Sequence, residues 1–138
     1  MISVTAEYAL RAVVVLAQSA GTPLTARDVA EAGSLPRDYT AKVLGDLAQA
    51  GIVHGRRGIG GGYTLLRAPN DLTALEVVNA VDPIRRIERC PLDRPDHEEL
   101  CPLHKRIDRV AADAQAAFAK TRISDLLDEQ GRALCEED

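Results

Sequence analysis

Two segments near the start of the chain place apolar side chains at helical spacing. The first begins at residues 3–5 and ends near 21–23, where a glycine and a proline together stop a helix. The second spans 26–32; Thr25 is expected to cap its start in a variant of the capping box, and Gly33 is expected to close it. The pattern therefore predicts one long helix followed by one short helix.

A third helical stripe follows Ser34 and Pro36, because serine can cap a helix and proline is tolerated in its first turn. The apolar positions expected to be buried are Tyr39, Val43, Leu44 and Leu47. Gly51 ends this stripe. Two short helices joined by a tight turn predict a helix-turn-helix.

Two short stretches, 52–54 and 63–66, are typical of strands and surround a glycine-rich turn. Glycine allows positive φ and close approach of the backbone to another surface. Arg56 and Arg57 add cationic forks that suit phosphate or a narrow minor groove. A hairpin of this composition directly after a helix-turn-helix predicts a DNA-binding wing.

The second half of the chain begins with a short helix, 74–81, capped by Thr73, and continues into a proline-rich stretch without periodicity. Further apolar residues then recur at alternating spacings of four and three, namely Leu103, Ile107, Val110, Ala114 and Ala117. This seam predicts a helix of about 28 Å that packs on a partner helix. A last short helix around Ile123 precedes an acidic tail.

These elements predict a mostly α fold, a winged helix-turn-helix domain with a small β-hairpin wing and a long C-terminal helix. The aromatic content of 3% and the absence of tryptophan agree with an aliphatic core built on helices. We expect a DNA-binding domain over 1–81, with the helix-turn-helix at 25–51 and the wing at 52–66, a loop over 82–101, and the long helix with its tail over 102–138.

The net charge of −4 is unevenly distributed along the chain. Residues 1–69 carry seven basic and five acidic side chains, whereas residues 70–138 carry ten and sixteen. The acidic balance therefore does not oppose a basic, nucleic-acid-binding surface on the first half. No stretch resembles a signal peptide or a membrane span, so we expect a cytoplasmic protein with no membrane partner.

The exposed face of the third helix is the first candidate DNA contact. We assign Arg37, Asp38, Thr40 and Lys42 to the major groove, Tyr39 to either the core or a phosphate, and Arg56, Arg57, Gly60 and Gly61 to the adjacent backbone or minor groove. An ordinary solvated polar face is the alternative. The neighbouring wing and the local positive charge favour double-stranded DNA as the partner.

Cys90, Cys101 and His104 form the second constellation, and the last two lie three residues apart on one helix face. Thiolates and imidazole suit an iron-sulfur cluster or zinc, and a bound metal would explain how a proline-rich loop is ordered. An inert pair of thiols beside a helix-capping histidine is the alternative. Cys135 lies in the acidic tail and has no partner motif.

Several stretches of the chain together resemble one family of bacterial regulators. They are the helix-turn-helix, the run 50–53, the arginine and glycine wing 57–63, the run 75–81 and the segment 101–127. In this order they resemble the Rrf2 (Rrf-two) family of winged helix-turn-helix regulators, in its IscR/NsrR-like, iron-sulfur cluster sensing form. The resemblance covers nearly the whole chain and implies a homodimer, clasped through the long dimerisation helix, that binds a palindromic operator.

Sensing members of this family usually carry three cysteines in the loop, whereas this chain has two. Cys90 resembles the first of them and Cys101 the third, and His104 falls where some members place a histidine ligand. Glu7 matches an acidic position that in some members reaches the cluster from the partner subunit. The resemblance thus implies a [2Fe-2S] cluster, and imidazole in place of thiolate should raise its reduction potential.

The fourth ligand has alternatives. Glu7 lies near a helix start, where a carboxylate also favours the helix macrodipole, and His97 and Asp96 are rival ligands inside the loop.

The leading hypothesis is a dimeric DNA-binding repressor that senses redox or nitrosative stress, or iron-sulfur status, through this cluster. A second hypothesis keeps the DNA-binding fold without a cluster, as a thiol-switch or metabolite-responsive repressor. A third, a small metal-binding enzyme, lacks a nucleophile-base arrangement or a phosphate loop, so we expect no enzyme.

Overall fold

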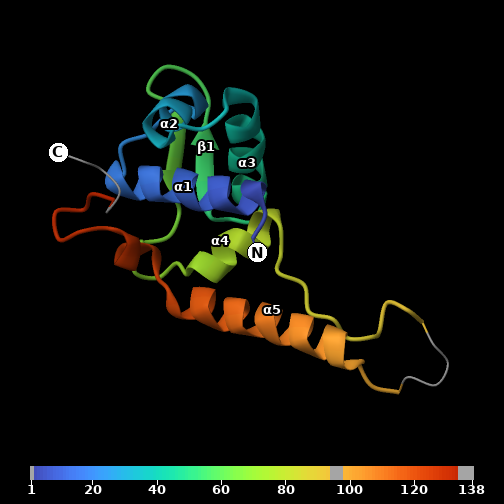
Figure 1. Ribbon diagram of the computed structural model, residues 1–138. Helices are drawn as coiled ribbons and strands as arrows, with labels where there is room; N and C mark the ends of the chain where they lie inside the picture. The colour runs from blue at the N-terminus through green and yellow to red at the C-terminus, as the bar shows by residue number, and fades with distance from the viewer. Residues whose placement is uncertain (1, 94–97, 134–138) are drawn as a thin grey trace.

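The computed structural model describes residues 2–93 and 98–133. Its elements in chain order are α1 (Val4–Gln18), α2 (Ala26–Gly33), α3 (Arg37–Gln49), β1 (Val53–Arg56), β2 (Gly62–Leu65), α4 (Ala74–Val81), α5 (Pro102–Lys120) and the 3₁₀ helix η1 (Ile123–Leu126). In Figure 1, α1, α2, α3 and the hairpin gather at one end, while α5 extends away from them. The mostly helical fold with a small two-stranded sheet confirms the predicted fold class.

Side-chain caps start the first helices as the sequence predicts. Ser3 accepts the Ala6 backbone N–H at 3.1 Å, and Thr25 forms a complete capping box with Asp28. The helix α2 ends at Gly33 as predicted, but Gly33 is still helical and the left-handed residue that follows the helix is Ser34, with φ 52°. Ser34 therefore does not cap α3, whose N-cap is Pro36 with no side-chain hydrogen bond.

The hairpin register pairs Val53 with Leu65 and Arg56 with Gly62, so β1 extends further than the sequence predicts and contains Arg56. A bridge also joins β2 to the segment before α2: Tyr63 and Leu24 exchange backbone hydrogen bonds at 2.6 and 3.1 Å. Gly62 has φ 136°, and a Cβ at this position would lie 2.7 Å from the Leu24 backbone. Only glycine allows this contact, which ties the wing to the helix-turn-helix.

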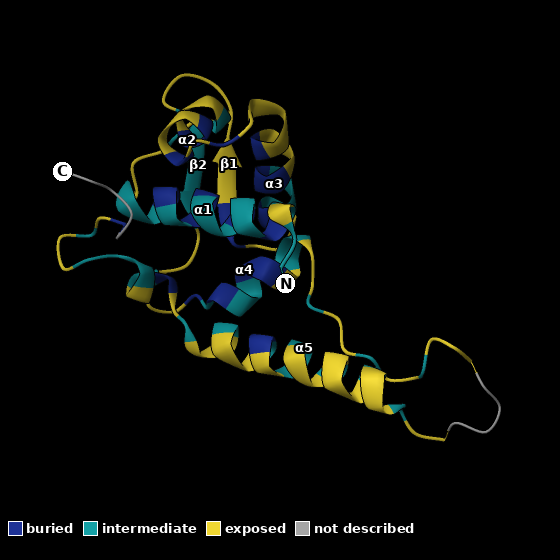
Figure 2. Cartoon of the chain, in the orientation of Figure 1, coloured by how far each residue is buried: buried dark blue, intermediate teal, exposed yellow. Residues whose placement is uncertain are grey.

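The core is aliphatic and lies among α1, α3, α4 and the start of the hairpin, where Figure 2 shows the buried positions. Its largest fully buried side chains include Leu16, Leu44, Leu47, Leu72 and Ile123. Ile123 comes from the far end of the chain, and its backbone N–H donates to the Leu72 carbonyl at 2.9 Å. The segment after α5 thus returns to the core of the N-terminal elements.

The helix α5 is exposed over most of its length, most clearly toward the loop at its start (Figure 2). Of its 19 residues only Ala114 is buried. Its end is anchored where the Ala74 N–H donates to the Thr121 carbonyl at 2.8 Å. Within the described chain, no helix combines the length and apolar character that crossing a bilayer demands.

Candidate DNA interface and metal centre

The exposed face of α3 presents Arg37, Asp38 and Lys42 to solvent, as the sequence predicts. Arg37 and Lys42 make only exposed ion pairs, with Glu31 at 3.6 Å and Asp46 at 3.1 Å. Such pairs contribute little, so both side chains can exchange these partners for phosphate at small cost.

The structure corrects the expectation that Thr40 lies on this exposed face. Its side chain is 1% exposed, and its hydroxyl donates to the Pro36 carbonyl at 2.8 Å. The hydroxyl closes the first turn of a helix that has no side-chain cap. Thr40 therefore supports α3 from within and is removed from the predicted set of DNA contacts.

The prediction that Tyr39 belongs to the buried stripe of α3 is wrong, because its side chain is 50% exposed. Its ring makes an edge contact with Tyr8 of α1, with ring centroids 6.0 Å apart. The hydroxyl end of Tyr39 remains available to a phosphate, while its ring packs α3 against α1.

The wing presents its cations at an exposed turn. Within the described chain neither Arg56 nor Arg57 has an ion-pair partner, and both are exposed. They line a hollow of about 460 Å³ together with Thr25 at the start of α2. Gly60 is exposed at the turn, and Gly61 is so close to the Arg56 carbonyl that a side chain there would clash. The turn thus combines unpaired cations with closely approaching backbone.

Sequence reasoning missed Ile59, which is fully exposed at the tip of the wing. Its signal was a single apolar residue inside the glycine run. An exposed isoleucine beside two arginines adds an apolar contact to the cationic turn.

Cys90, Cys101 and His104 converge as the sequence predicts. The Cys101 Sγ lies 3.0 Å from His104 Nδ1 and the Cys90 Sγ lies 3.7 Å from it. All three ligand atoms are within 4.8 Å of one another. Cys101 is the N-cap of α5 and His104 lies in its first turn, so the helix holds two of the three donors. Two sulfurs and one imidazole nitrogen at this separation fit an iron-sulfur cluster or zinc.

The pKa of Cys101 is lowered to about 7. The largest cause is the His104 backbone N–H, followed by the His104 ring, and the Cys90 thiol adds a smaller effect. A substantial fraction of Cys101 is therefore thiolate near neutral pH, which is the form that binds a metal.

Glu7 does not join this group within one chain. It lies in the first turn of α1 and accepts two hydrogen bonds from Arg11 Nη2, at 2.7 and 2.8 Å. Arg11 in turn donates from Nη1 to the carbonyls of Gly33 and Ser34, both at 3.2 Å. Glu7 is thus linked through Arg11 to the turn of the helix-turn-helix. The rival ligands His97 and Asp96 lie outside the described residues.

A second contact missed by sequence reasoning holds the segment before Cys90 against α5. Asp108 accepts two hydrogen bonds from Arg86, both at 2.7 Å, and one from the Ile87 backbone N–H at 2.8 Å. Arg86 and then the Ile87 N–H lower the pKa of Asp108 to about 2. No sequence spacing connects residues 22 apart, so the contact had no signal in the sequence.

Comparison with known proteins identifies the family. A family model described as "Iron-dependent Transcriptional regulator" matches residues 2–129. The chain belongs to the Rrf2 family. It is 34% identical over 116 residues to the HTH-type transcriptional repressor NsrR of Streptomyces coelicolor, a match that covers 81% of this chain and 75% of that protein.

Solved structures of Rrf2 regulators share the fold. The structure of CymR, the global cysteine regulator of Bacillus subtilis, is similar with a TM-score of 0.72 and 25% identity, over 91% of this chain and 95% of that one. The IscR of T. potens also has a TM-score of 0.72, at 22% identity over 91% of this chain and 84% of that one. The Rrf2 relatives are transcriptional regulators, and the chain is a regulator of this family.

Proposed function

We propose that this Rrf2 regulator is a homodimeric repressor of a palindromic operator whose DNA affinity depends on a [2Fe-2S] cluster. Cys90, Cys101 and His104 hold the cluster, and Glu7 of the second subunit completes the set. The observation that carries this proposal is the convergence of two sulfurs and one imidazole nitrogen within 4.8 Å, at the start of the long helix of an Rrf2 chain.

The donor set is suited to the group it would hold. When bound, a [2Fe-2S] cluster would supply a one-electron redox centre, with a potential raised by imidazole ligation. Cys101 offers a thiol that is readily ionised near neutral pH. The His104 Nδ1 lies within 3.7 Å of both sulfurs, and a [2Fe-2S] cluster, which takes four protein ligands, would need one further ligand besides these three.

The chain's own contacts connect Glu7 to the DNA-binding elements. Glu7 holds Arg11, and Arg11 holds the two carbonyls of the turn before α3. If Glu7 leaves Arg11 to bind the cluster, the contacts of Arg11 with the turn before α3 also change. That turn sets the position of the proposed recognition helix, α3. A dimer reads two half-sites about 34–36 Å apart, so a shift of either recognition helix changes operator affinity.

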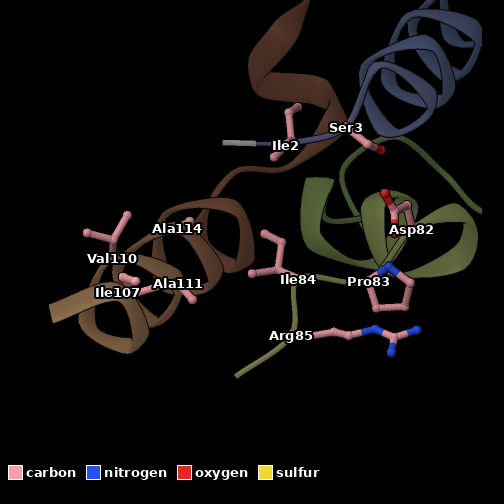
Figure 3. A pocket seen from close by; sticks show the side chains of 10 residues that line it. All are labelled: Ile2, Ser3, Asp82, Pro83, Ile84, Arg85, Ile107, Val110, Ala111 and Ala114. Atoms are coloured by element: carbon pink, nitrogen blue, oxygen red, sulfur yellow. The ribbon is translucent and has the colours of Figure 1, made fainter. Parts of the chain in front are cut away.

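The dimer surface in this proposal is the apolar seam of α5. Leu103, Ile107 and Val110 are exposed at its loop-proximal end. Ile107 and Val110 also line a hollow of about 430 Å³, together with Ile2, Ile84, Ala111 and Ala114, among others. Figure 3 shows Ile84 directed toward α5. Apart from the buried Ala114, the described residues leave the start of this apolar seam uncovered, and such a seam fits a second copy of the same helix.

Anaerobic isolation tests the proposal. Iron and sulfide analysis together with visible absorption shows whether a cluster is present, and operator binding is then measured with the cluster intact, oxidised, exposed to nitric oxide, and removed. We expect coloured, iron-containing protein whose operator affinity changes with the state of the cluster. Colourless, iron-free protein with unchanged affinity throughout contradicts the proposal.

A second candidate function is a thiol switch on the same fold. It is supported by the 3.0 Å distance between the Cys101 Sγ and His104 Nδ1 and by the similarity to CymR, the global cysteine regulator of Bacillus subtilis. Absorption spectra distinguish the two, because a bound cluster gives visible charge-transfer bands and a pair of thiols gives none.

Replacing Arg57 with alanine tests the wing. We expect operator affinity to fall roughly 10-fold, because each half-site is then bound with one cation fewer. We also expect the slope of log affinity against log salt to flatten by about 0.9 for each phosphate that the variant no longer neutralises. Arg109→Ala is the matched control, since Arg109 is an exposed arginine on α5. A slope equal to that of wild type removes Arg57 from the interface.

Replacing Glu7 with alanine tests the ligand from the partner subunit. The visible spectrum of the anaerobic protein is expected to shift, whereas the melting temperature should hardly change, because the half-exposed Glu7–Arg11 pair is worth only about 0.5 kcal/mol. Glu31→Ala, which breaks a similar exposed pair on α2, is the control. An unaltered spectrum transfers the assignment to His97 or Asp96.

A further inference from the structure

The segment between α4 and Cys90 contains no helix or strand, yet it is bound to α5 at two places. Asp108 holds Arg86 and the Ile87 N–H, and Gln115 donates to the Ile84 carbonyl at 2.8 Å. Asp108 and Gln115 are two turns apart, so both contacts use one face of α5. We call the Asp108 contacts with Arg86 and Ile87 the Asp108 staple.

The face of α5 that carries Asp108 also carries His104, one of the three proposed cluster ligands. His104 precedes Asp108 by four residues and therefore lies one turn away on the same face. Cys90 follows Ile87 by three residues, which places it within about 10 Å of the anchored backbone. The staple thus limits the positions that Cys90 can reach, and in the structure its sulfur lies 3.7 Å from His104 Nδ1.

The three donors differ in what holds them. Cys101 and His104 belong to α5 and keep their relative position as long as the helix persists. Cys90 lies on a segment without regular structure, so the completeness of the group depends on contacts outside it. Ordering loop residues costs conformational entropy, and a loop that is ordered before binding avoids this cost at the moment of binding.

We propose that Asp108 is a positioning residue that presents Cys90 to Cys101 and His104, and that it thereby determines how firmly the group retains its cluster. The placement of Cys90 by Asp108 is a property of the metal-free chain. The effect of Asp108 on cluster retention rests on the proposed function. The carboxylate suits this role because its side chain is only 16% exposed and each oxygen accepts at least one hydrogen bond from Arg86 or Ile87, in the segment between α4 and Cys90.

Three variants and one control separate the contributions. Asp108→Ala removes the whole staple, Asp108→Asn keeps an oxygen that can accept the Ile87 N–H, and Arg86→Gln removes the guanidinium alone. Asp113→Asn is the matched control, because Asp113 is an exposed aspartate on the same helix that pairs with Arg109 at 3.6 Å. Circular dichroism and the melting temperature of the metal-free proteins check that the variants are folded.

The first measurement is cluster loss from anaerobic protein in the presence of an iron chelator. We expect loss on the order of 10-fold faster in Asp108→Ala and Arg86→Gln, a smaller effect in Asp108→Asn, and the wild-type rate in Asp113→Asn.

The second measurement uses metal-free protein with Cys135→Ser in all variants, equilibrated with reduced and oxidised glutathione. Formation of the Cys90–Cys101 disulfide breaks the glutathione disulfide and transfers two protons and two electrons to give two reduced glutathiones. With Cys90 no longer presented, we expect the disulfide to dithiol ratio to fall roughly 10-fold in Asp108→Ala and to stay unchanged in Asp113→Asn.

The outcomes are distinguishable. Wild-type rates and ratios in both Asp108→Ala and Arg86→Gln overturn the inference and leave the proposed function intact. A wild-type chain that takes up no cluster overturns the proposed function and with it the retention effect, and the glutathione ratio then decides whether Asp108 places Cys90.

Discussion

Replacing Cys101 with serine is expected to abolish the proposed cluster binding, so that anaerobically isolated protein lacks the visible absorption and essentially all of the iron that we expect in wild type. Serine has nearly the same shape, but its hydroxyl does not ionise near neutral pH, whereas the pKa of Cys101 is lowered to about 7. The variant also loses the sulfur that lies 3.0 Å from His104 Nδ1, and with it the contact between Cys101 and His104 at the start of α5. Iron and sulfide analysis and the absorption spectrum are the measurements.

The control for this variant is Cys135→Ser, which removes a thiol that has no partner motif in the sequence. We expect the control to keep the iron content and spectrum of wild type. A Cys101→Ser protein that retains the wild-type spectrum excludes Cys101 as a ligand. If wild type holds no iron and oxidants alter its operator affinity only while Cys101 is present, the thiol switch is the better description.

Replacing Ile107 with aspartate is expected to convert the proposed homodimer to a monomer. Ile107 is 47% exposed in the single chain and lies in the middle of the exposed part of the seam, where a charge opposes burial against a second helix. A monomer contacts only one half-site at a time, so operator affinity should fall by roughly 10² to 10⁴. Sedimentation gives the oligomeric state, and titration of a labelled operator gives the affinity.

Ala116→Asp is the matched control, because Ala116 is exposed and, from helical geometry, lies on the side of α5 opposite the seam. It introduces the same charge on the same helix, and we expect it to remain a dimer with wild-type affinity. Circular dichroism should show both variants folded, since neither position belongs to the core. A dimeric Ile107→Asp protein places the subunit contact on another surface.

Much of the fold follows from local signals in the sequence. Thr25 and Thr73 start helices because their side chains cap the first turn, and both form capping boxes in the structure. The predicted start of α5 at Pro102 is confirmed, since proline suits the first turn of a helix. These signals act over three or four residues and are therefore readable without tertiary structure.

The errors arise where a side chain has two uses. Serine can cap a helix, but Ser34 instead takes the left-handed position that ends α2. Threonine on a helix is usually exposed, but Thr40 satisfies its hydroxyl on a backbone carbonyl and is therefore buried without penalty. Tyr39 is apolar enough for a core, but its ring packs at the surface against Tyr8.

The sequence by itself determined the order of the helices, the position of the hairpin and the identity of the cysteine and histidine donors, because caps, apolar periodicity and residue chemistry are local. Only the tertiary structure decided that the two thiols and the imidazole meet, that Glu7 is held by Arg11, and that Asp108 anchors the segment between α4 and Cys90. The contact between Arg86 and Asp108 joins residues 22 positions apart in the sequence. It forms only because the chain folds back on α5, and no local sequence pattern encodes that.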